Sequence, residues 1–240
     1  YPYSDHEMIR GFLEVSPFIE PIVAMSFMAA ATKKIRFCCG VMKVPMRQPL
    51  ILAKQLSSLA VMSGERLDFG AGISPWKEDF TYNGVPFEKR GERFDEVIGI
   101  IRDAMKGEYF EHHSGNYNFA PLRLCPVPKK PIPVIIGGHA KPALARAARL
   151  GDGWFSANSD PETLKQMIDQ LNALRVEFGT QKHPDFRIHF AQSADDYKQV
   201  RDLGATDLCA MGWNPFDDNL TLQAKIDGIR RFGDEVIARV

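Results

Sequence analysis

The chain has 240 residues, 45% of them hydrophobic, and its 30 basic residues balance 30 acidic ones at an isoelectric point near 7.2. This length can bury one large core, and balanced charge without a basic tract argues against a nucleic-acid-binding or membrane-surface protein. No apolar run approaches the roughly 18 residues that span a bilayer, and the start, YPYSDHEMIR, lacks the charged-then-apolar order of a signal peptide.

After a mixed start over 1–16 that we interpret as loop, the first half of the chain alternates between helical and strand-like patterns. Residues 35–44, IRFCCGVMKV, indicate a buried strand interrupted by Gly40, and residues 66–73 indicate a second strand that ends in glycines. Residues 74–89 indicate a loop. Apolar density and periodicity, in two cases with proline near the start, predict helices at 17–32, 49–62 and 90–105.

Residues 108–130 form a long irregular insertion that is aromatic and punctuated by prolines. Long segments without regular structure are uncommon in compact domains unless they are functional or folded on themselves. We therefore expect this insertion to be either a lid or a packed hairpin.

The second half of the chain opens with a β-branched run at 134–136, which indicates a strand buried on both faces. Gly137 and Gly138 end this strand, and a helix over 142–150 and a strand over 154–157 follow. The remaining patterns predict helices at 160–178, 193–203 and 220–240 and strands at 186–191 and 207–211.

The strict alternation of six predicted strands with helices indicates an all-parallel sheet with helices outside. No linker or low-complexity segment interrupts it, so we expect one domain over 1–240. The regular rhythm favours a (β/α) barrel over a doubly wound sheet. Glycines and short polar residues gather after the strands, at the end of the sheet where parallel α/β folds bind ligands.

The glycine pair after residues 134–136 has a chemical use of its own. Two glycines allow a ligand to approach the backbone closely, and the free N–H groups at the following helix start favour an anion such as phosphate. The alternative is an ordinary tight turn of an α/β protein. The segment matches neither the Walker loop nor the full G-x-G-x-x-G fingerprint.

Five segments of the chain form an ordered set of short motifs. They are Gly40-Val41 with Pro45-Met46-Arg47-Gln48-Pro49, Gly64-Glu65-Arg66-Leu67 with Gly70-Ala71-Gly72, Asn83-Gly84-Val85-Pro86-Phe87 with Arg90 and Asp95-Glu96, Pro133 to Gly138, and Ala147-Ala148-Arg149-Leu150-Gly151-Asp152-Gly153-Trp154. In this order and spacing they resemble the luciferase-like monooxygenase superfamily, and most of all its branch that uses the deazaflavin coenzyme F420. The resemblance covers roughly 17–240.

The resemblance implies a (β/α)8 TIM barrel that binds a flavin-type ring at the carboxyl ends of its strands. Family members begin with further elements, so the first one or two strands would be missing ahead of Tyr1. In the family, the strand matching 35–44 carries a bulge behind the isoalloxazine ring, often with a non-prolyl cis peptide. The matching positions here are Cys39 and Gly40, with Val41 beside them, and a simple strand kink at Gly40 is the alternative.

The same resemblance implies two further groups of cofactor-binding residues. One lines the side chain of the cofactor, and the other holds its phosphate and the edge of its ring. These groups are Gly72, Ile73 and Ser74, and Gly137, Gly138, His139 and Ala140.

We interpret most of the other reactive residues as structural. The cysteines Cys38, Cys39, Cys125 and Cys209 have no CxxC spacing, which indicates reduced, buried thiols in a cytoplasmic protein. The histidines have no metal-ligand spacing. His6 and the His112-His113 pair indicate loops, and His189 indicates a position in the core or in the barrel lumen. Trp76 is expected to line a pocket and Trp154 to pack in the barrel, and Arg47 either reaches the ligand or forms an ion pair at a helix start.

From the resemblance we expect an oxidoreductase that transfers hydride between coenzyme F420 and a small organic substrate. FMN is the alternative cofactor, with an FMNH2-dependent monooxygenase or a non-catalytic flavin-binding member as the alternative functions. The sequence supports no catalytic acid or base and no metal site. A homodimer is expected from the resemblance and from the apolar helix at 17–32.

Overall fold

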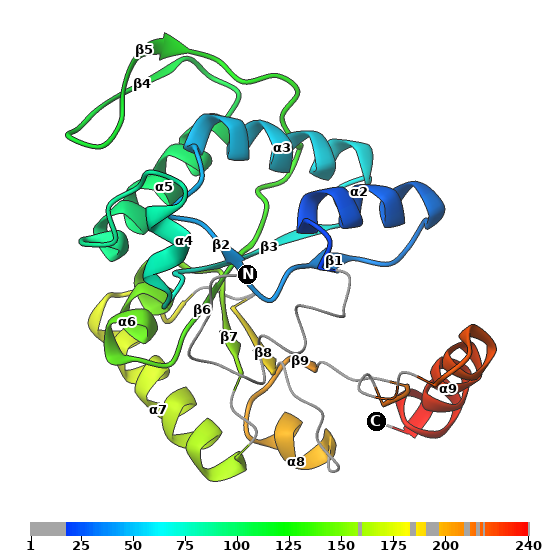
Figure 1. The fold of residues 1–240 in the computed structure, drawn as a ribbon. Coiled ribbons are helices and arrows are strands. Elements are labelled where there is room, and N and C mark those ends of the chain that lie inside the picture. The colour runs from blue at the N-terminus through cyan, green and yellow to red at the C-terminus, as the bar shows by residue number, and fades with distance from the viewer. Residues whose placement is uncertain are drawn as a thin grey trace. The chain divides into compact units, whose positions relative to one another are not determined.

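The computed structural model describes residues 18–157, 160–182, 186–190, 197–208, 212–214, 217 and 219–239. The chain divides into two compact units, Tyr1–Gly137 and Gly138–Val240. Parallel strands alternate with helices in each unit (Figure 1). The sequence interpretations of 1–16, His6, Cys209 and 209–211 concern positions outside the described residues.

Strand β3 (Leu67–Gly72) is the centre of the first unit, and all six of its residues are buried. It pairs in parallel with β1 (Phe37–Cys38), β2 (Met42–Lys43) and β6 (Val134–Gly137). The helices of this unit are α2 (Pro21–Ala31), α3 (Pro49–Met62), α4 (Lys77–Thr81) and α5 (Arg90–Met105).

Helices α3 and α5 pack against each other, and each presents an apolar stripe at helical spacing. Leu52, Leu56 and Leu59 of α3 are buried, as are Phe94 and Val97 of α5. Both helices begin and end where the sequence predicts. In α3, Pro49 occupies the first turn, where its missing N–H costs no hydrogen bond.

The buried side chain of Arg66 ties the end of α2 to the start of β3. Its guanidinium donates to the carbonyl oxygens of Ala29 (3.0 Å), Thr32 (3.1 Å) and Ile35 (2.7 Å). These acceptors lie at or just beyond the carboxyl end of a helix, where a positive charge is favourable. Arg66 thereby fixes the chain that leads from α2 into β1.

The long insertion contains an antiparallel hairpin formed by β4 (Phe110–His113) and β5 (Asn118–Leu122). Strand β4 contacts α5, and Figure 1 shows the hairpin beyond α3 and α5. Of the two expectations for this insertion, a lid or a packed hairpin, the structure shows a packed hairpin. Its use as a lid stays a prediction.

In the second unit, β8 (Arg187–Phe190) pairs in parallel with β7 (Gly153–Ser156) and with β9 (Asp207–Leu208). Helix α6 packs on α7, which begins at the capping residue Asp160, whose side chain accepts from the Thr163 amide at 2.9 Å. The helices are α6 (Lys141–Leu150), α7 (Pro161–Glu177), α8 (Tyr197–Asp202) and α9 (Leu222–Glu235), with the short 3-10 helix η1 (Ile237–Arg239) after them.

The predicted alternation of parallel strands and helices is confirmed, and several details are corrected. The expected loop 74–89 contains helix α4, because Glu78 and Asp79 favour the first turn of a helix. His112 and His113 lie in strand β4 and not in a loop. Cys38, Cys39 and Cys125 are free, but Cys125 is exposed and the other two are only half-buried. Closure into an eight-stranded barrel stays a prediction.

None of the helices in the described part of the chain has the length and the apolar character that crossing a bilayer requires.

Candidate functional site

A β-bulge interrupts the first strand of the first unit. Cys38 pairs with Asp68 and Met42 pairs with Ala71, so four steps along the first strand match three steps along β3. The extra residue lies in the segment Cys39–Val41, and the Gly40–Val41 peptide bond is cis. The bulge that the sequence predicts around Cys39 and Gly40 is therefore present, at the carboxyl-terminal half of β3.

Three glycines leave the space that the residues of this bulge occupy. A Cβ at Gly70 would lie 1.6 Å from the carbonyl oxygen of Cys39, and a Cβ at Gly72 would lie 2.3 Å from Cγ2 of Val41. On the neighbouring strand, a Cβ at Gly137 would lie 2.9 Å from Cγ1 of Val41. The structure thus brings together three of the predicted residues, Val41, Gly72 and Gly137, through packing within the protein. The sequence reasoning missed Gly70, although it stands two residues before Gly72 and so faces the same side of β3.

Polar side chains, of which Ser74 is buried, collect where β2 and β3 end. The hydroxyl of Ser74, a buried residue, donates to the Asp79 carboxylate, and Lys43 lies 2.6 Å from the same carboxylate. The Lys43 ammonium also lies 4.5 Å from the centroid of the Trp76 ring. Ser74 is therefore oriented by Asp79. Neither Lys43 nor Asp79 was identified from the sequence, where the only signal is an acidic residue shortly after a glycine-rich strand end.

A second ion pair lies near the bulge. Nη1 of Arg47 is 3.0 Å from Oε1 of Glu20, whose other carboxylate oxygen accepts from the Val23 amide at the start of α2. This contact selects the ion-pair interpretation of Arg47. Burial raises the pKa of the Cys39 thiol, against the opposing influence of Arg47. Cys39 is accordingly a neutral thiol and a poor nucleophile.

The turn that the sequence singles out as a phosphate site begins the second unit. Gly138 has a φ of +125°, a conformation that L side chains rarely adopt, and a Cβ there would lie 2.7 Å from Cβ of Ala143. Ala140 precedes the first residue of α6. The turn carries one cation, Lys141, and no acidic residue over 137–142. A helix start with this charge suits an anion.

Two side chains hold the turn. Nε1 of Trp154 donates to the Gly138 carbonyl oxygen at 2.9 Å, and Nε2 of His139 accepts from the Ala157 amide at 2.9 Å. The His139 and Trp154 rings meet edge to face at 6.2 Å. Burial lowers the pKa of His139, which agrees with a neutral imidazole whose Nε2 accepts a hydrogen bond. Trp154 is fully buried, as the sequence predicts.

His189, the other histidine of the second unit for which the sequence predicts a role, lies in β8. Its ring stacks on Phe155 at 5.4 Å, and Nε2 lies 3.8 Å from Oδ2 of Asp207. The side chain is 12% exposed. These contacts confirm a packed strand position.

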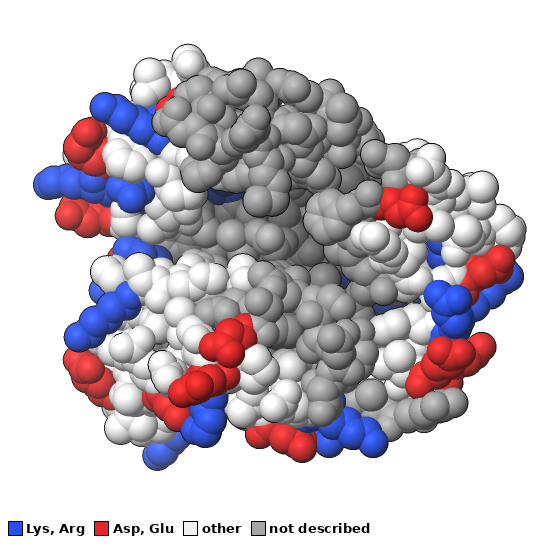
Figure 2. All heavy atoms as spheres, turned by 60° about the horizontal axis from the view of Figure 1, so that its bottom comes forward, with Lys and Arg blue, Asp and Glu red and all other residues white. Residues whose placement is uncertain are grey.

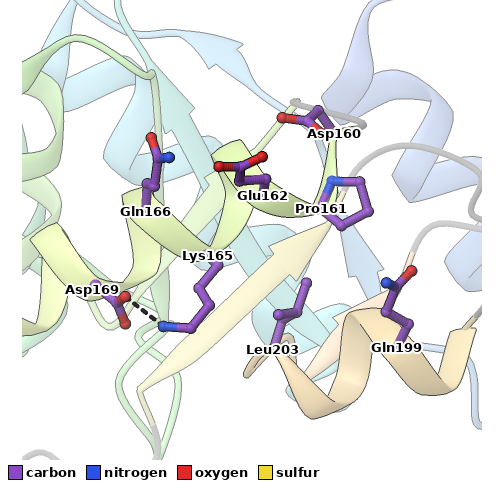
Figure 3. Close-up of a pocket in the computed structure, with 8 residues that line it drawn as sticks. All are labelled: Asp160, Pro161, Glu162, Lys165, Gln166, Asp169, Gln199 and Leu203. Atoms are coloured by element: carbon purple, nitrogen blue, oxygen red, sulfur yellow. Dashed lines mark hydrogen bonds and ion pairs between the residues drawn. The ribbon is translucent and has the colours of Figure 1, made fainter.

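An open groove of about 520 Å³ lies between α7 and α8 (Figure 3). Its described lining includes Asp160, Glu162 and Asp169, and Lys165 pairs with Asp169 at 2.5 Å. These residues stand on the outer faces of helices, and their charges are exposed. The groove resembles an ordinary solvated surface between helices more than a site for chemistry.

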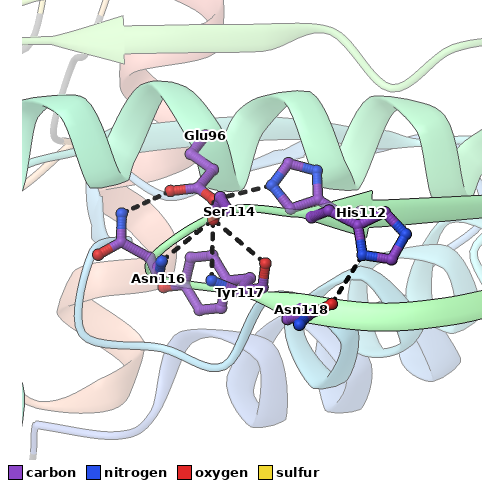
Figure 4. A network of polar contacts seen from close by, with 7 residues as sticks. Glu96, His112, Ser114, Asn116, Tyr117 and Asn118 are labelled. Atoms are coloured by element: carbon purple, nitrogen blue, oxygen red, sulfur yellow. Dashed lines mark hydrogen bonds and ion pairs between the residues drawn. The ribbon is translucent and has the colours of Figure 1, made fainter.

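A polar cluster fastens the hairpin to α5 (Figure 4). The Glu96 carboxylate lies 2.8 Å from Nε2 of His112 and accepts from Nδ2 of Asn116 at 2.7 Å and from the Ser114 hydroxyl. Burial of Glu96 opposes ionisation, but these three hydrogen bonds together lower its pKa. The carboxylate is thus fully engaged as an acceptor, and the cluster is structural.

No group of three or more His, Cys, Asp or Glu side chains that could hold a metal ion occurs among the residues whose placement is described. On the face drawn in Figure 2, acidic and basic side chains of the described residues lie interspersed. The bulge and the glycine turn therefore remain the two candidate binding regions.

Parallel strands alternating with helices, with glycines at the strand ends, define an α/β protein of the kind that binds ligands beside those ends. Comparison with known proteins identifies the family to which this α/β protein belongs. The family model for luciferase-like monooxygenase matches residues 3–214. The chain belongs to this family, whose members are oxidoreductases and monooxygenases.

The chain is 40% identical, over its whole length and 84% of the relative, to the uncharacterized protein Rv0940c of Mycobacterium tuberculosis. It is 28% identical to the FMNH2-dependent dimethylsulfone monooxygenase of Pseudomonas putida, over 64% of this chain and 44% of that protein. Among solved structures it resembles the coenzyme F420-dependent tetrahydromethanopterin reductase of Methanopyrus kandleri, with a TM-score of 0.64 and 19% identity over 72% of this chain and 54% of that one. The chain thus spans about half of that reductase.

Proposed function

We propose that this protein is an oxidoreductase that transfers hydride between coenzyme F420 and a small organic substrate. The observation that carries the proposal is the bulge at Cys39–Val41, seated on glycines at the carboxyl end of β3 in a chain of the luciferase-like family. When bound in its reduced form the deazaflavin would donate hydride to the substrate, and in its oxidised form it would accept one, because carbon in place of N5 favours hydride transfer over oxygen chemistry. The protein contributes position, burial and polarity.

The residues divide by role. Cys39, Gly40 and Val41 are assigned to the face of the ring. Gly72 and Gly137 support Val41, because the valine methyl groups already occupy the space beside them. Ile73 and Ser74 are assigned to the cofactor side chain, with Ser74 oriented by Asp79.

The phosphate is assigned to the turn of Gly138, His139 and Ala140. The fit rests on the positive φ of Gly138, on the start of α6 and on the absence of acidic residues over 137–142. We assign no catalytic acid or base.

Titration of the purified chain with coenzyme F420 and, separately, with FMN tests the proposal through quenching of cofactor fluorescence. We expect micromolar binding of F420 and weaker binding of FMN. The variant Gly138→Ala should lose affinity, while Gly84→Ala, at another positive-φ glycine in an open turn, should retain it. Failure to bind either cofactor would sink the proposal.

An FMNH2-dependent monooxygenase is the second candidate, favoured by the relationship to the Pseudomonas putida enzyme. It predicts the opposite titration, with micromolar FMN binding and no response to F420. Formation of an oxygenated product from a candidate substrate, in the presence of reduced FMN and oxygen and dependent on the protein, would then establish the activity. A member that binds flavin without turnover would show binding in the titration and no substrate-dependent oxidation of the reduced cofactor.

We also propose that the chain forms a homodimer through α2. This helix is apolar on all sides, yet Val23 and Phe27 are 62% and 78% exposed, and Phe18 just before it is 75% exposed. Helices that are apolar all round are normally covered. Sedimentation velocity should show a dimer that Phe27→Glu converts to monomer, whereas Ile229→Glu, at an exposed position of α9, leaves it intact. A monomeric wild type contradicts the proposal.

A cytoplasmic location is the last part of the proposal. Cys38, Cys39 and Cys125 are free thiols, and such thiols are typical of a reducing compartment. Cell fractionation of the source organism, with detection by antibody, tests this directly.

A further inference from the structure

The indole of Trp154 makes a polar contact that packing alone does not require. The side chain is fully buried in β7, and its only polar group, Nε1–H, donates to the Gly138 carbonyl oxygen at 2.9 Å. A buried indole needs a partner for this proton. The partner here is a main-chain carbonyl in the middle of the turn that we assign to the cofactor phosphate.

The geometry of the peptide unit links the Gly138 carbonyl to the direction of the next N–H, that of His139. The Gly138–His139 peptide is not among the cis bonds of the chain, so it is trans. In a trans peptide the carbonyl and the N–H point in opposite directions. Because Trp154 holds the Gly138 carbonyl, the N–H of His139 must point away from the indole.

A second contact holds the side chain of His139, the residue that carries this N–H. The Ala157 amide, just beyond β7, donates to Nε2 of His139 at 2.9 Å. With Nε2 accepting, the proton of the neutral ring lies on Nδ1. Trp154 of β7 therefore fixes the carbonyl of Gly138, and Ala157 just beyond the strand fixes the side chain of His139. The positive φ of Gly138, with Ala143 packed where a Cβ would lie, completes the constraint.

We propose that Trp154 is a positioning residue for anion binding, which aims the main-chain N–H of His139 at the cofactor phosphate. This inference rests on the proposed function. It goes beyond it by assigning the orientation of the phosphate donor to a side chain on the next strand. A donor that is already oriented costs no reorganisation when the anion arrives.

The test compares each cofactor with a counterpart that lacks the phosphate. The flavin pair differs by the phosphate alone and isolates its contribution, and the deazaflavin pair measures the phosphate together with the rest of its side chain. The pairs are FMN with riboflavin, and coenzyme F420 with the deazaflavin chromophore that lacks the phosphodiester chain. We expect the wild-type chain to bind the phosphorylated member more tightly. In Trp154→Phe the ratio of the two Kd values should fall about 3- to 10-fold, the worth of one hydrogen bond. The Kd for riboflavin or the bare chromophore should stay within about twofold.

A purely packing role for Trp154 predicts a different result, because looser packing weakens both members of a pair and leaves the ratio unchanged. Benzothienylalanine at position 154 gives a second variant with the indole shape and sulfur in place of Nε1–H. It should lower the ratio as Trp154→Phe does, and it keeps the test valid if the phenylalanine variant folds poorly. Phe94→Leu, at a fully buried position of α5 in the first unit, is the packing control that should keep the wild-type ratio.

The outcomes separate the two proposals. An unchanged ratio in both Trp154 variants, with tight binding of the phosphorylated member, overturns the role of Trp154 and leaves the proposed function standing. A wild-type chain that binds flavins or deazaflavins without regard to phosphate overturns the phosphate turn itself, and with it this inference. A wild-type chain that binds none of the four probes overturns the proposed function as a whole.

Discussion

The two candidate binding regions use glycine for different physical reasons. At the bulge, Gly70 and Gly72 leave room for main-chain and side-chain atoms of the preceding strand. At the turn, Gly138 is needed for its backbone conformation, and polar contacts from Trp154 and to His139 hold the result. The bulge is kept in place by close packing, and the turn is kept in place largely by hydrogen bonds.

The two regions should therefore respond differently to substitutions and to pH. A packed region resists small perturbations but has no room for an added methyl group. A region held by a few hydrogen bonds tolerates changes of shape, yet it depends on single polar groups and on pH. Substitutions in the two regions, and a change of pH, test whether packing and hydrogen bonding differ in this way.

Gly70→Ala should produce the largest effect. Its Cβ would lie 1.6 Å from the Cys39 carbonyl oxygen, a main-chain atom that cannot move without shifting the bulge. We expect a loss of more than about 3 kcal/mol in the free energy of unfolding, measured by urea denaturation. Gly99→Ala, within α5 and with open space around it, should be neutral or stabilise by up to about 1 kcal/mol. Equal effects of the two substitutions would contradict a steric role for Gly70.

Gly72→Ala should cost about 2–3 kcal/mol, because its Cβ would meet Cγ2 of Val41 at 2.3 Å. In a Val41→Ala background that methyl group is gone, and the cost of Gly72→Ala should fall by about 1–2 kcal/mol. A double-mutant cycle from denaturation curves measures this coupling. Additive effects would show that Val41 does not determine the need for glycine at position 72.

Gly138→Ala should cost about 2 kcal/mol, from the unfavourable φ and from contact with Ala143. Gly84→Ala is the control without a packing contribution, because Gly84 also has a positive φ, of +65°, but open space around it. Ala143→Gly should recover part of the loss at position 138. If Gly84→Ala and Gly138→Ala cost the same and Ala143→Gly recovers nothing, the packing term is absent.

The smallest effect should be the response of the turn to acid. Burial lowers the pKa of His139 below its usual 6.5, so the unfolded chain binds this proton more readily than the folded chain. The contribution of His139 to stability is intact above pH about 6.5 and is lost as the pH falls from there through the lowered pKa. The melting temperature should therefore fall between pH 7.5 and 5.5, and fall less in His139→Gln, which keeps an acceptor and does not titrate.

His113 in the hairpin provides the opposite sign for the same experiment. Hydrogen bonds to Asn118 and Glu111 raise its pKa, so its contribution is present at low pH and is lost as the pH rises through the raised value. His113→Gln should not reduce the loss of stability in acid. A reduced loss in His113→Gln but not in His139→Gln would contradict these assignments.

Local patterns predicted most elements well, because helix periodicity and capping are properties of neighbouring residues. Helices α3 and α5 match their predicted ranges, and strand β3 lies within its range. The hairpin was only one of two possibilities, since the contacts that fasten it run from Glu96 to His112 and Asn116. Helix α4 was missed because its five residues are too few for a periodic pattern.

The sequence by itself determined the alternation of strands and helices, the break at Gly40 and the glycine turn before α6, because each depends on residues close together in the chain. Tertiary structure alone decided why the glycines are needed and what holds them. Val41 reaches Gly72 and Gly137 only when β2, β3 and β6 align, and Trp154 reaches Gly138 only when α6 folds between them. Such contacts leave no local pattern, because they depend on where the backbone returns and not on which residues are adjacent.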